Sequence, residues 1–354
     1  MEGYRPAYSI KANGSEITPT IADRLLSLRF EEVAEDEADE LVIRLDERPT
    51  RLGYAIELPE VDTLLELSLG YENNRVLKGK FRVDEIRLTG PPRSLEVRAS
   101  SAAFSKAIRS AKTRTWHYDF ASPQGETSPE GYTGTLGSMA EIIGREHGLD
   151  VQVDPQLADQ KIPHQEQQHQ SDLAFLNKQA EFYDAVAKPV GDAIVVAKKA
   201  KAEAPSGVKL PAYRLRPRDV VNYTYTHRAR RAPGADNQDG GGVKAYWYDY
   251  DAGERRSVKV GPPPYEEVKH LHQGVGAERK ARAKAEAEYN ASERRKKEFT
   301  FTMPGKPQIV AEGKISLTGW QPMIPTEWRV VRVEHAISNN GYTTSATCEV
   351  LNSG

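Results

Sequence analysis

The sequence predicts an α+β protein that is mostly β, in which two β-rich regions flank one α/β insert. Between residues 5 and 100 apolar and polar residues alternate in several short segments, and this two-residue period is typical of half-buried strands. Helical spacing of apolar residues appears between 101 and 204, and strand-like alternation returns after 205. We therefore expect a first β domain over 1–100, an insert domain over 101–204 and a second β domain over 205–354.

Bulk composition sets limits on the class of protein. A chain of 354 residues can hold two or three domains with cores of their own. With 49 basic and 51 acidic residues the net charge is −2, which gives no global attraction to nucleic acid or to a membrane surface. Cys348 is the single cysteine, so no intrachain disulfide is possible and nothing here points to secretion. The N-terminus lacks an apolar signal core and no apolar run reaches membrane-spanning length, so we expect a soluble protein made in the cytoplasm, without membrane insertion.

The first region consists of short strands separated by turns. Apolar residues alternate in Leu26–Phe30 and again in Leu41–Leu45, and Asn13-Gly14 is a strong hairpin-turn signal. The acidic run Glu31–Glu40 between them is expected to be a solvated loop that discourages edge pairing. Strands this short, with turns at such intervals, predict a small barrel or sandwich.

The insert begins with an extended segment, Lys112–Phe120, and then two helices are expected. The first starts at Leu136, is capped by Thr135 and ends near Gly148. The second is capped by Ser171 or Asp172, since either side chain can accept from the free N–H groups of the first turn. Its apolar residues are Leu173, Phe175, Leu176, Ala180, Phe182 and Tyr183.

A hairpin ends the insert, and the last region is more varied. Gly191-Asp192 separates two apolar segments and predicts a two-residue turn. Residues 200–210 are a linker, and 232–242 is a mobile loop of small polar residues and glycine. Residues 276–297 form a helix whose only apolar residues are alanines and Tyr289, so its buried face is shallow. Strands follow from Phe299 onward.

Three stretches of the sequence carry a family resemblance. Near mid-chain the chain reads QSDLAFLNKQAEFYDAVAKPVGDAI, preceded by KTRTW, and the first region contains DELVIRLDE, LSLGY and GKFRVDEIRLTGPPRSLEVRA. The last third reads FTFTMPGKP, AEGKISLTGW, WRVVRVEHAIS and GYTT. In order and spacing these stretches resemble phage late control D proteins, the baseplate hubs of contractile tails, and the related hub regions of type VI secretion spike proteins. Residues 201–274 are only weakly marked. The matching positions in the last third are Gly305, Pro307, Gly313, Gly319, Val333, His335, Gly341, Tyr342 and Thr343.

The resemblance implies a structural role. Such hubs are homotrimers whose subunits carry two tail-tube-like β-barrel domains, here with an α/β insert domain between them. The implied function is to join the trimeric central spike to the hexameric tail tube, with the spike protein, the tube protein or a tube-initiator ring, and other baseplate proteins as partners. The particle would be a phage virion or an R-type pyocin-like tailocin, assembled in the bacterial cytoplasm and released on lysis. The helix 276–297 would pack on the second barrel.

No candidate chemistry assembles from the residues alone. His164 and His169 are five residues apart, and His270 and His272 are two apart, without the third or fourth ligand that zinc needs. Neither GxSxG nor GxxxxGK[ST] occurs, and Gly240–Gly242 is about thirty residues before the next helix, too far to form a phosphate loop. We therefore expect no catalytic residue, metal or cofactor and no enzyme activity. A type VI-like spike hub and a cell-wall glycan hydrolase are the alternatives.

Two basic clusters are the candidate contacts for nucleic acid. His227–Arg231 and Arg294–Lys297 are both rich in cations, but no helix-turn-helix pattern surrounds either. Arg294–Lys297 comes at the end of a predicted helix, where cations complement the helix dipole. We expect no sequence-specific nucleic-acid binding.

Overall fold

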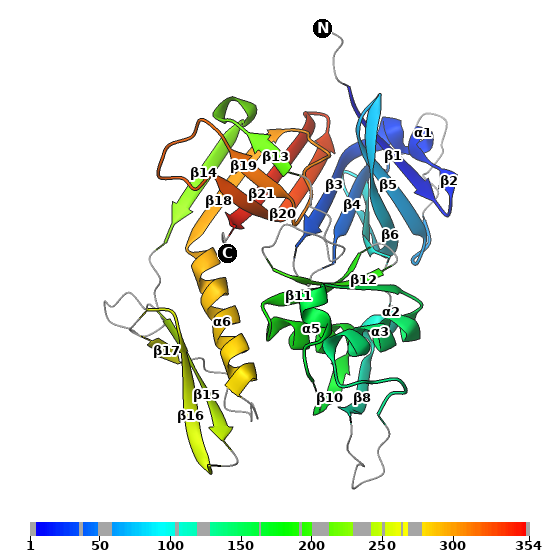
Figure 1. Ribbon diagram of the computed structural model, residues 1–354. Helices are drawn as coiled ribbons and strands as arrows, with labels where there is room; N and C mark the ends of the chain where they lie inside the picture. Colours follow the sequence, from blue (N-terminus) through cyan, green and yellow to red (C-terminus); the bar gives the residue numbers. More distant parts are fainter. Residues whose placement is uncertain are drawn as a thin grey trace.

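The structure is a computed structural model (Figure 1). It describes residues 5–34, 38–48, 59–102, 106–118, 128–162, 164–190, 193–199, 212–228, 242–249, 252–262, 265–267 and 278–351. The predicted linker 200–210, the turn Gly191-Asp192, most of the loop 232–242 and both His270 and His272 lie outside these residues.

The first β-rich part, residues 5–102, consists mainly of strands, and along a strand buried residues alternate with more exposed ones. In the last of them Leu95, Val97 and Ala99 are buried while the residues between them remain partly exposed, as the two-residue period of a strand requires. Two short helices, α1 (Thr18–Ile21) and the 3₁₀ turn η1 (Ala22–Arg24), precede β3. The strands are β1 (Pro6–Ala12), β2 (Ser15–Glu16), β3 (Leu25–Val33), β4 (Glu40–Asp46), β5 (Leu64–Tyr71), β6 (Asn74–Thr89) and β7 (Ser94–Ser101).

The second β-rich part comprises residues 212–228 and 297–351. Phe299, Phe301 and Met303 of its strand β18 are buried in alternation. The 3₁₀ turn η2 (Pro217–Asp219) connects its first two strands. The strands are β13 (Ala212–Leu215), β14 (Asn222–His227), β18 (Lys297–Pro304), β19 (Lys314–Leu317), β20 (Glu327–Ser338) and β21 (Gly341–Val350).

One strand pairing makes a single sheet of both parts. β3 runs antiparallel to β20, with Ser27 opposite Ser338 and Glu31 opposite Glu334. The resulting thirteen-stranded sheet follows the path β14-β18-β21-β20-β3-β4-β7-β6-β5-β1-β2, with β13 and β19 beside it. Among the described residues no pairing closes this path into a barrel, so the predicted two-barrel architecture stays a prediction, whereas the mostly β class is confirmed.

The acidic run between β3 and β4 differs from its prediction. Glu31, Glu32 and Glu40 belong to strands and not to a solvated loop. They are placed there because β3 needs its full length to pair with both β4 and β20. The Asn13-Gly14 turn is confirmed, and both residues adopt the positive φ that a tight hairpin requires.

The insert, residues 106–199, combines helices and strands. The helix α3 begins after Thr135, whose hydroxyl accepts from the Ser138 N–H, and ends at Gly148 with a φ of 66°. Ser171 caps the second helix, α5. The elements are α2 (Lys106–Arg109), β8 (Ala111–His117), α3 (Leu136–His147), β9 (Asp150–Val153), α4 (Pro155–Ala158), β10 (His164–Ser171), α5 (Asp172–Glu181), β11 (Ala185–Val190) and β12 (Ala193–Lys198).

A smaller unit, which we call the hairpin unit, lies apart from the large sheet at the lower left of Figure 1. It consists of β15 (Gly242–Asp249), β16 (Glu254–Val260), β17 (Tyr265–Glu267) and the helix α6 (Glu278–Arg295). Ala281 and Ala285 of α6 pack with Val243, Ala245 and Val258. The shallow buried face is confirmed, but α6 lies on this small sheet and only its last turn reaches β18 and β21. Alanine side chains allow the flat hairpin to approach the helix closely, which explains why α6 packs on this hairpin and not mainly on the large sheet.

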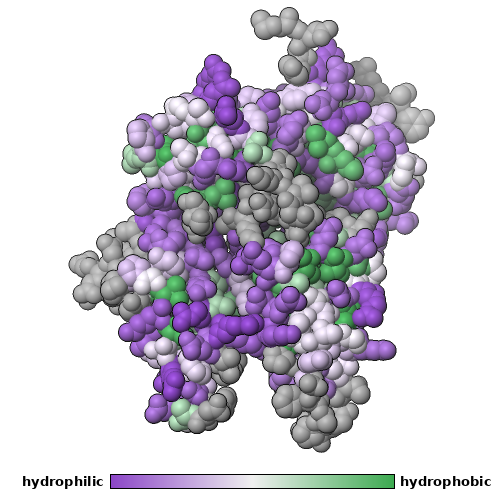
Figure 2. Space-filling view, in the orientation of Figure 1, coloured by the Kyte–Doolittle hydropathy of each residue, from purple (hydrophilic) through white to green (hydrophobic). Residues whose placement is uncertain are grey.

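Each of the four units has its own cluster of buried apolar side chains. The cluster of the first β-rich part also takes in Ile337 and Tyr342 from the second. Hydrophilic side chains cover most of the visible surface, with scattered apolar patches (Figure 2). No helix of the described chain is both long and apolar enough to span a membrane.

Candidate functional site

The units of this chain meet at buried polar contacts, and the first of these surrounds His335 in β20. The imidazole is fully buried. Its Nε2 lies 3.0 Å from the Ile309 carbonyl oxygen, which can only accept, so Nε2 carries the proton. Nδ1 therefore accepts, and the Tyr342 hydroxyl lies 2.9 Å from it, with the Thr344 hydroxyl at 3.0 Å. Burial, helped by the nearby charge of Lys78, lowers the pKa of His335 to about 3, so the ring is neutral at physiological pH.

The residues around His335 connect the second β-rich part to the first. The Tyr71 hydroxyl donates to the Gly305 carbonyl at 2.9 Å, and Lys78 Nζ donates to the Pro307 carbonyl at 2.7 Å. A Cβ at position 305 would lie 2.0 Å from the Tyr342 ring, so only glycine fits there. We call this group the histidine joint, and it uses four of the motif positions in the last third of the sequence: Gly305, Pro307, His335 and Tyr342.

Charged side chains of the first part border the histidine joint. The Phe30 ring stacks on His335 with 6.1 Å between centroids, and Lys78 Nζ lies 5.6 Å from the Phe30 centroid. Glu32 keeps some surface exposure, yet atoms pack densely around its carboxyl group. This desolvation raises the pKa of Glu32 to about 7, against the opposing effect of Lys78.

Lys188 connects the insert to the first β-rich part. It is a single lysine in the apolar segment AVAKPV of β11, and it is only 7% exposed. Its Nζ donates to Asp39 Oδ1 at 2.6 Å and also to the Val33 carbonyl. The same Asp39 oxygen accepts from the Val33 N–H at 3.1 Å, so one carboxylate fixes both the strand end and the lysine. We call this the lysine joint.

Two arginines connect the insert, α6 and the second β-rich part. Arg294, in the last turn of α6, binds both carboxylate oxygens of Asp184 in the insert, at 2.6 and 2.7 Å. Its Nε lies 3.4 Å from Glu349 Oε1. Arg329 of β20 is fully buried, pairs with the same Glu349 and donates to Glu312 at 2.7 Å. Bidentate arginine contacts of this kind fix geometry as well as charge, and we call the group the arginine joint.

The arginine joint changes the interpretation of the basic cluster Arg294–Lys297. Arg294 is 4% exposed and is engaged with carboxylates on two other elements. Lys296 pairs with Glu293 at 2.6 Å. In the other cluster Arg228 pairs with Glu298 at 3.3 Å, while residues 229–231 lie outside the described chain. Three cations of the two clusters, Arg228, Arg294 and Lys296, are therefore engaged with carboxylates.

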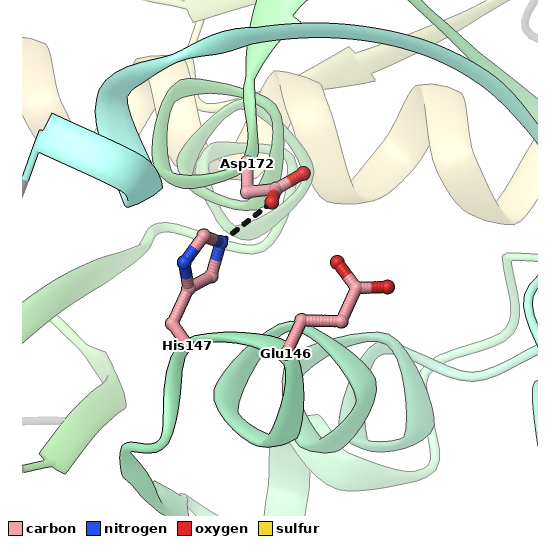
Figure 3. A group of neighbouring side chains, drawn as sticks. All are labelled: Glu146, His147 and Asp172. Carbon is pink, nitrogen blue, oxygen red and sulfur yellow. Dashed lines mark hydrogen bonds and ion pairs between the residues drawn. The ribbon is translucent and has the colours of Figure 1, made fainter.

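A charged cluster inside the insert contains Glu146, His147 and Asp172 (Figure 3). It is the single group of three metal-ligand side chains found among the described residues. Asp172 is buried and accepts from His147 Nε2 at 2.7 Å, from Lys112 at 2.6 Å and from Arg114 at 2.7 Å. Burial acts to raise the pKa of Asp172, but hydrogen bonds from Gln167, Lys112 and His147 and the charge of Arg114 outweigh it and lower the pKa. A divalent cation would have to displace two cations that already neutralise the carboxylates, so the cluster is better suited to holding the insert together.

The same cluster explains two mid-chain motifs. Lys112 and Trp116 come from the segment KTRTW, Asp172 comes from the segment QSDLAFL, and Gln167 precedes that segment by three residues. The Trp116 indole N–H donates to the buried Gln167 Oε1 at 3.2 Å, across the paired strands β8 and β10. Of the two predicted caps, Ser171 is the one that caps α5, and Asp172 is the buried ion-pair partner. The two motifs are thus one structural unit.

The predicted histidine pair His164 and His169 is not assembled into a ligand cluster. His164 lies opposite His117 in the β8–β10 register, whereas His169 has a positive φ at the irregularity between the two strands. Neither belongs to a group of three metal-ligand side chains in the described part of the chain. The absence of a metal site stays a prediction.

The large sheet also presents a broad polar surface. The strands β14, β18, β21, β20, β3, β4, β7 and β6 pair antiparallel in this order, and we call them the eight-strand band. Its side opposite the apolar clusters, the polar face, has two sectors. The first β-rich part contributes Ser27, Arg29, Glu31, Glu40, Arg44, Glu85, Arg87, Glu96 and Arg98. The second contributes Thr300, Thr302, Glu334, Thr343, Ser345 and Thr347.

Ion pairs neutralise most of the charge on the polar face. Arg29 lies within 3.5–3.8 Å of carboxylates from Glu31, Glu40 and Glu334. Arg98 lies 2.9 Å from Glu96 and 3.5 Å from Glu40. The polar face is therefore hydrophilic without a strong net charge of either sign.

The motif positions are visible in the sequence, but their contacts are not. Lys188, Arg329 and Glu349 carry no local signal beyond a charged residue in an apolar strand. That signal was available for Lys188 and Arg329, since a lysine or arginine almost never lies fully buried unless it is paired. Their partners are far away in the sequence, so the joints became visible only in the fold.

Comparison with known proteins agrees with the motifs. No family model matches the chain. The chain is 27% identical over 387 aligned positions to the "Probable baseplate hub protein" of Escherichia phage 186, covering 98% of this chain and 93% of that protein. The protein of the same description from Escherichia phage P2 is 25% identical with the same coverage.

Solved structures show the same fold. The 43 kDa tail protein of prophage MuSo2 from Shewanella oneidensis has a TM-score of 0.70 at 12% identity, covering 97% of this chain and 98% of that one. The tail protein from Neisseria meningitidis MC58 has a TM-score of 0.66 at 11% identity, with coverage of 98% and 97%. The E. coli c3393 protein, a component of the type VI secretion system, has a TM-score of 0.53 at 10% identity, with coverage of 97% and 77%. The predicted resemblance is confirmed: the chain is a homologue, over nearly its whole length, of the probable baseplate hub proteins of phages 186 and P2.

Proposed function

We propose that this chain is the structural baseplate hub of a contractile injection particle, where it joins a trimeric central spike to the hexameric tail tube. The observation that carries the proposal is the eight-strand band, together with the similarity to two phage hub proteins over nearly the whole chain. One subunit holds two β-rich parts in a single sheet through the β3–β20 pairing. A trimer of such subunits repeats the β-rich part six times, which suits a junction between threefold and sixfold partners.

The band offers two edges through which copies can join. Among the described residues β14 pairs only with β18, and Glu85–Thr89 of β6 pair only with β7. Unpaired strand edges favour pairing with another chain. Because the band contains an even number of antiparallel strands, β6 of one copy can meet β14 of the next antiparallel, and three copies would form a ring of twenty-four strands.

Exposed apolar residues lie at both edges. Leu88 of β6 is 53% exposed although its register partner Leu95 is buried. Val221, just before β14, and Tyr223 within it are 70% and 43% exposed. All three residues are on the cluster side of the sheet, so pairing of the edges would bring them together and bury them. The polar face would then line the axial channel.

The joints suit a part that transmits force. The histidine, lysine and arginine joints tie the two β-rich parts, the insert and α6 into one body through buried contacts. The domain division at 1–100, 101–204 and 205–354 and closure into two tube-like barrels belong to this proposal. So do location in a virion or tailocin baseplate, assembly in the cytoplasm with release on lysis, and a role without catalysis.

The mass of the chain in solution tests the proposal. Light scattering should give three times the chain mass of 39.4 kDa, or a monomer that forms a three-plus-three complex with the spike protein encoded nearby. Leu88→Arg combined with Tyr223→Arg should abolish the trimer. Leu77→Arg, at a residue that is 61% exposed in the half of β6 that pairs with β5, is the matched control and should not.

Other outcomes would redirect the proposal. A monomer at all concentrations that ignores the spike protein would overturn the hub assignment. A clear zone on cell-wall substrate in a zymogram would instead favour the glycan hydrolase.

A further inference from the structure

The hairpin unit carries a cationic and aromatic surface that the hub role does not use. In the antiparallel pair β15 and β16, Lys244 lies opposite Lys259, Tyr246 opposite Ser257, and Tyr248 opposite Arg255. Directly opposed residues lie on the same side of a two-stranded ribbon. The other side contains Val243, Ala245 and Val258, which pack on α6. The six polar residues therefore face away from α6, and we call them the hairpin face.

The carboxylates of β15 and β16 lie on one side of the ribbon only. The hairpin face has three cations on β15 and β16 and no carboxylate on these two strands. The acidic residues Asp249 and Glu254 are opposite each other on the α6 side, where Asp249 pairs with Arg256 at 3.2 Å. The short strand β17 runs along the other edge of β15, where the backbone register places Glu267 beside Lys244.

The aromatic rings order the cations. Arg255 Cζ lies 4.0 Å from the centroid of the Tyr246 ring, and Lys244 Nζ lies 4.6 Å from it. Such contacts hold a cation in place while leaving its N–H donors available. Tyr248 donates its hydroxyl to the Gly253 carbonyl at 3.0 Å, which fixes its ring over the turn although the residue is 43% exposed. Preordered cations and tyrosines lose little side-chain entropy on binding.

We propose that the hairpin face is a docking surface for an acidic protein segment rich in aspartate or glutamate. Tyrosine and arginine are enriched in the centres of protein interfaces, and arginine binds carboxylates with two parallel hydrogen bonds. Nucleic acid fits less well because the Tyr246 ring is covered by Lys244 and Arg255 and is not offered to a base for stacking.

The position of the hairpin face in the chain supports a partner-specific role. It lies within residues 201–274, the stretch least marked by the family resemblance. The unit has its own small apolar cluster and stands apart from the large sheet (Figure 1). A change of sequence on this face would alter the partner without disturbing the eight-strand band or the joints.

Binding of a labelled poly-glutamate peptide to the full-length chain tests the proposal by fluorescence anisotropy at stepped salt. We expect binding that weakens as salt rises, because the contact is ionic and exposed. The triple variant Lys244→Glu, Arg255→Glu and Lys259→Glu should lose about tenfold or more in affinity, since each of three ion pairs is replaced by a repulsive one. Tyr248→Ala should weaken binding by a smaller factor.

A matched control separates the hairpin face from net charge. Three exposed cations of the insert are Arg109, Arg145 and Lys178. Changing all three to glutamate alters the net charge of the chain as much as the triple variant of the hairpin face does. This control should keep peptide binding. Equal loss in the control, no peptide binding by the unmodified chain, or tighter binding of a labelled single-stranded oligonucleotide than of the peptide would overturn the proposal. Both triple variants should keep the mass of the unmodified chain, so a failure here leaves the hub proposal to its own test.

Discussion

Arg329 and Arg98 are both arginines of the large sheet that lie among carboxylates, yet their surroundings differ. The Arg329 side chain is fully buried, and its partners Glu312 and Glu349 are 28% and 15% exposed. The Arg98 side chain is 40% exposed, and water reaches most of its partners on the polar face. Burial acts to lower the pKa of Arg329, but the hydrogen bonds and charges of its carboxylates raise it above the usual range.

The difference shows what each set of charges contributes. In the arginine joint the Arg329 guanidinium is buried away from water. Removing it would leave Glu312 and Glu349 without a cation in a poorly solvated site, which is costly. On the polar face solvent screens the attraction between arginine and carboxylate, so each ion pair contributes little to the free energy of unfolding. We infer that the joints hold the fold together, whereas the polar face only keeps a wide sheet surface hydrophilic.

The largest effect should come from Arg329→Met, which keeps the length of the side chain and removes its charge. It leaves Glu312 and Glu349 without their main cation, and we expect a loss of about 3–5 kcal/mol in the free energy of unfolding. Urea unfolding followed by tryptophan fluorescence measures it. Adding Glu312→Gln to the variant should restore part of the loss, and a double variant no better than the single one would contradict the ionic explanation.

His335 gives the next largest effect, through pH. Its pKa is about 3 in the folded chain and near 6.5 when unfolded, so between these values only the unfolded state takes up the proton. Stability from this residue is complete above pH 6.5 and falls as the pH drops toward 3, by about 2 kcal/mol at pH 5. His335→Gln should be less stable at pH 7 but should show a shallower fall between pH 7 and pH 5. Equal slopes for both proteins would show that His335 does not titrate as described.

Glu32 should act in the opposite direction with a smaller effect. Its pKa of about 7 lies above the unfolded value of 4.5, so the folded state holds a proton that the unfolded state has released. The stability contribution is therefore present below pH 4.5 and is lost as the pH rises through 7. Glu32→Gln should stabilise the chain by about 1–2 kcal/mol at pH 8, allowing for partial solvation of the carboxyl group, and should have little effect at pH 4.5. Differential scanning calorimetry at the two pH values measures the difference, and a stabilisation independent of pH would exclude titration of Glu32 as its cause.

Local signals in the sequence predicted local structure. The Thr135 cap and the Gly148 end of α3 were both predictable because a cap needs only neighbouring residues. The alternating strands followed from their period, and the family motifs indicated the hub fold. Asp172 shows the limit, since an aspartate beside a serine cap has the sequence of a cap but is a buried ion-pair partner.

Long-range contacts were not predictable in the same way. Arg294 and Asp184 are 110 positions apart, and nothing near either residue specifies the other. The sheet on which α6 packs was also predicted wrongly. An alanine face fits any flat surface, and the sequence does not specify which sheet lies next to the helix. The two-residue period of a strand likewise fixes which of its residues face the same side, but not which strands pair.

The smallest effect should come from the polar face, and it decides the comparison. Arg98→Met removes a guanidinium that lies near three carboxylates, whereas Arg329→Met removes one that pairs with two, but Arg98 and most of its partners are solvated. We expect a change of less than about 1 kcal/mol, and less still at high salt, because exposed ion pairs are weak and screened. Urea unfolding of both methionine variants at low and high salt measures the contrast directly. If Arg98→Met destabilised the chain as much as Arg329→Met, the polar face would be a structural network in its own right and not a solvated wall. A small effect would leave the face free to change its charge during evolution, because stability would not constrain it.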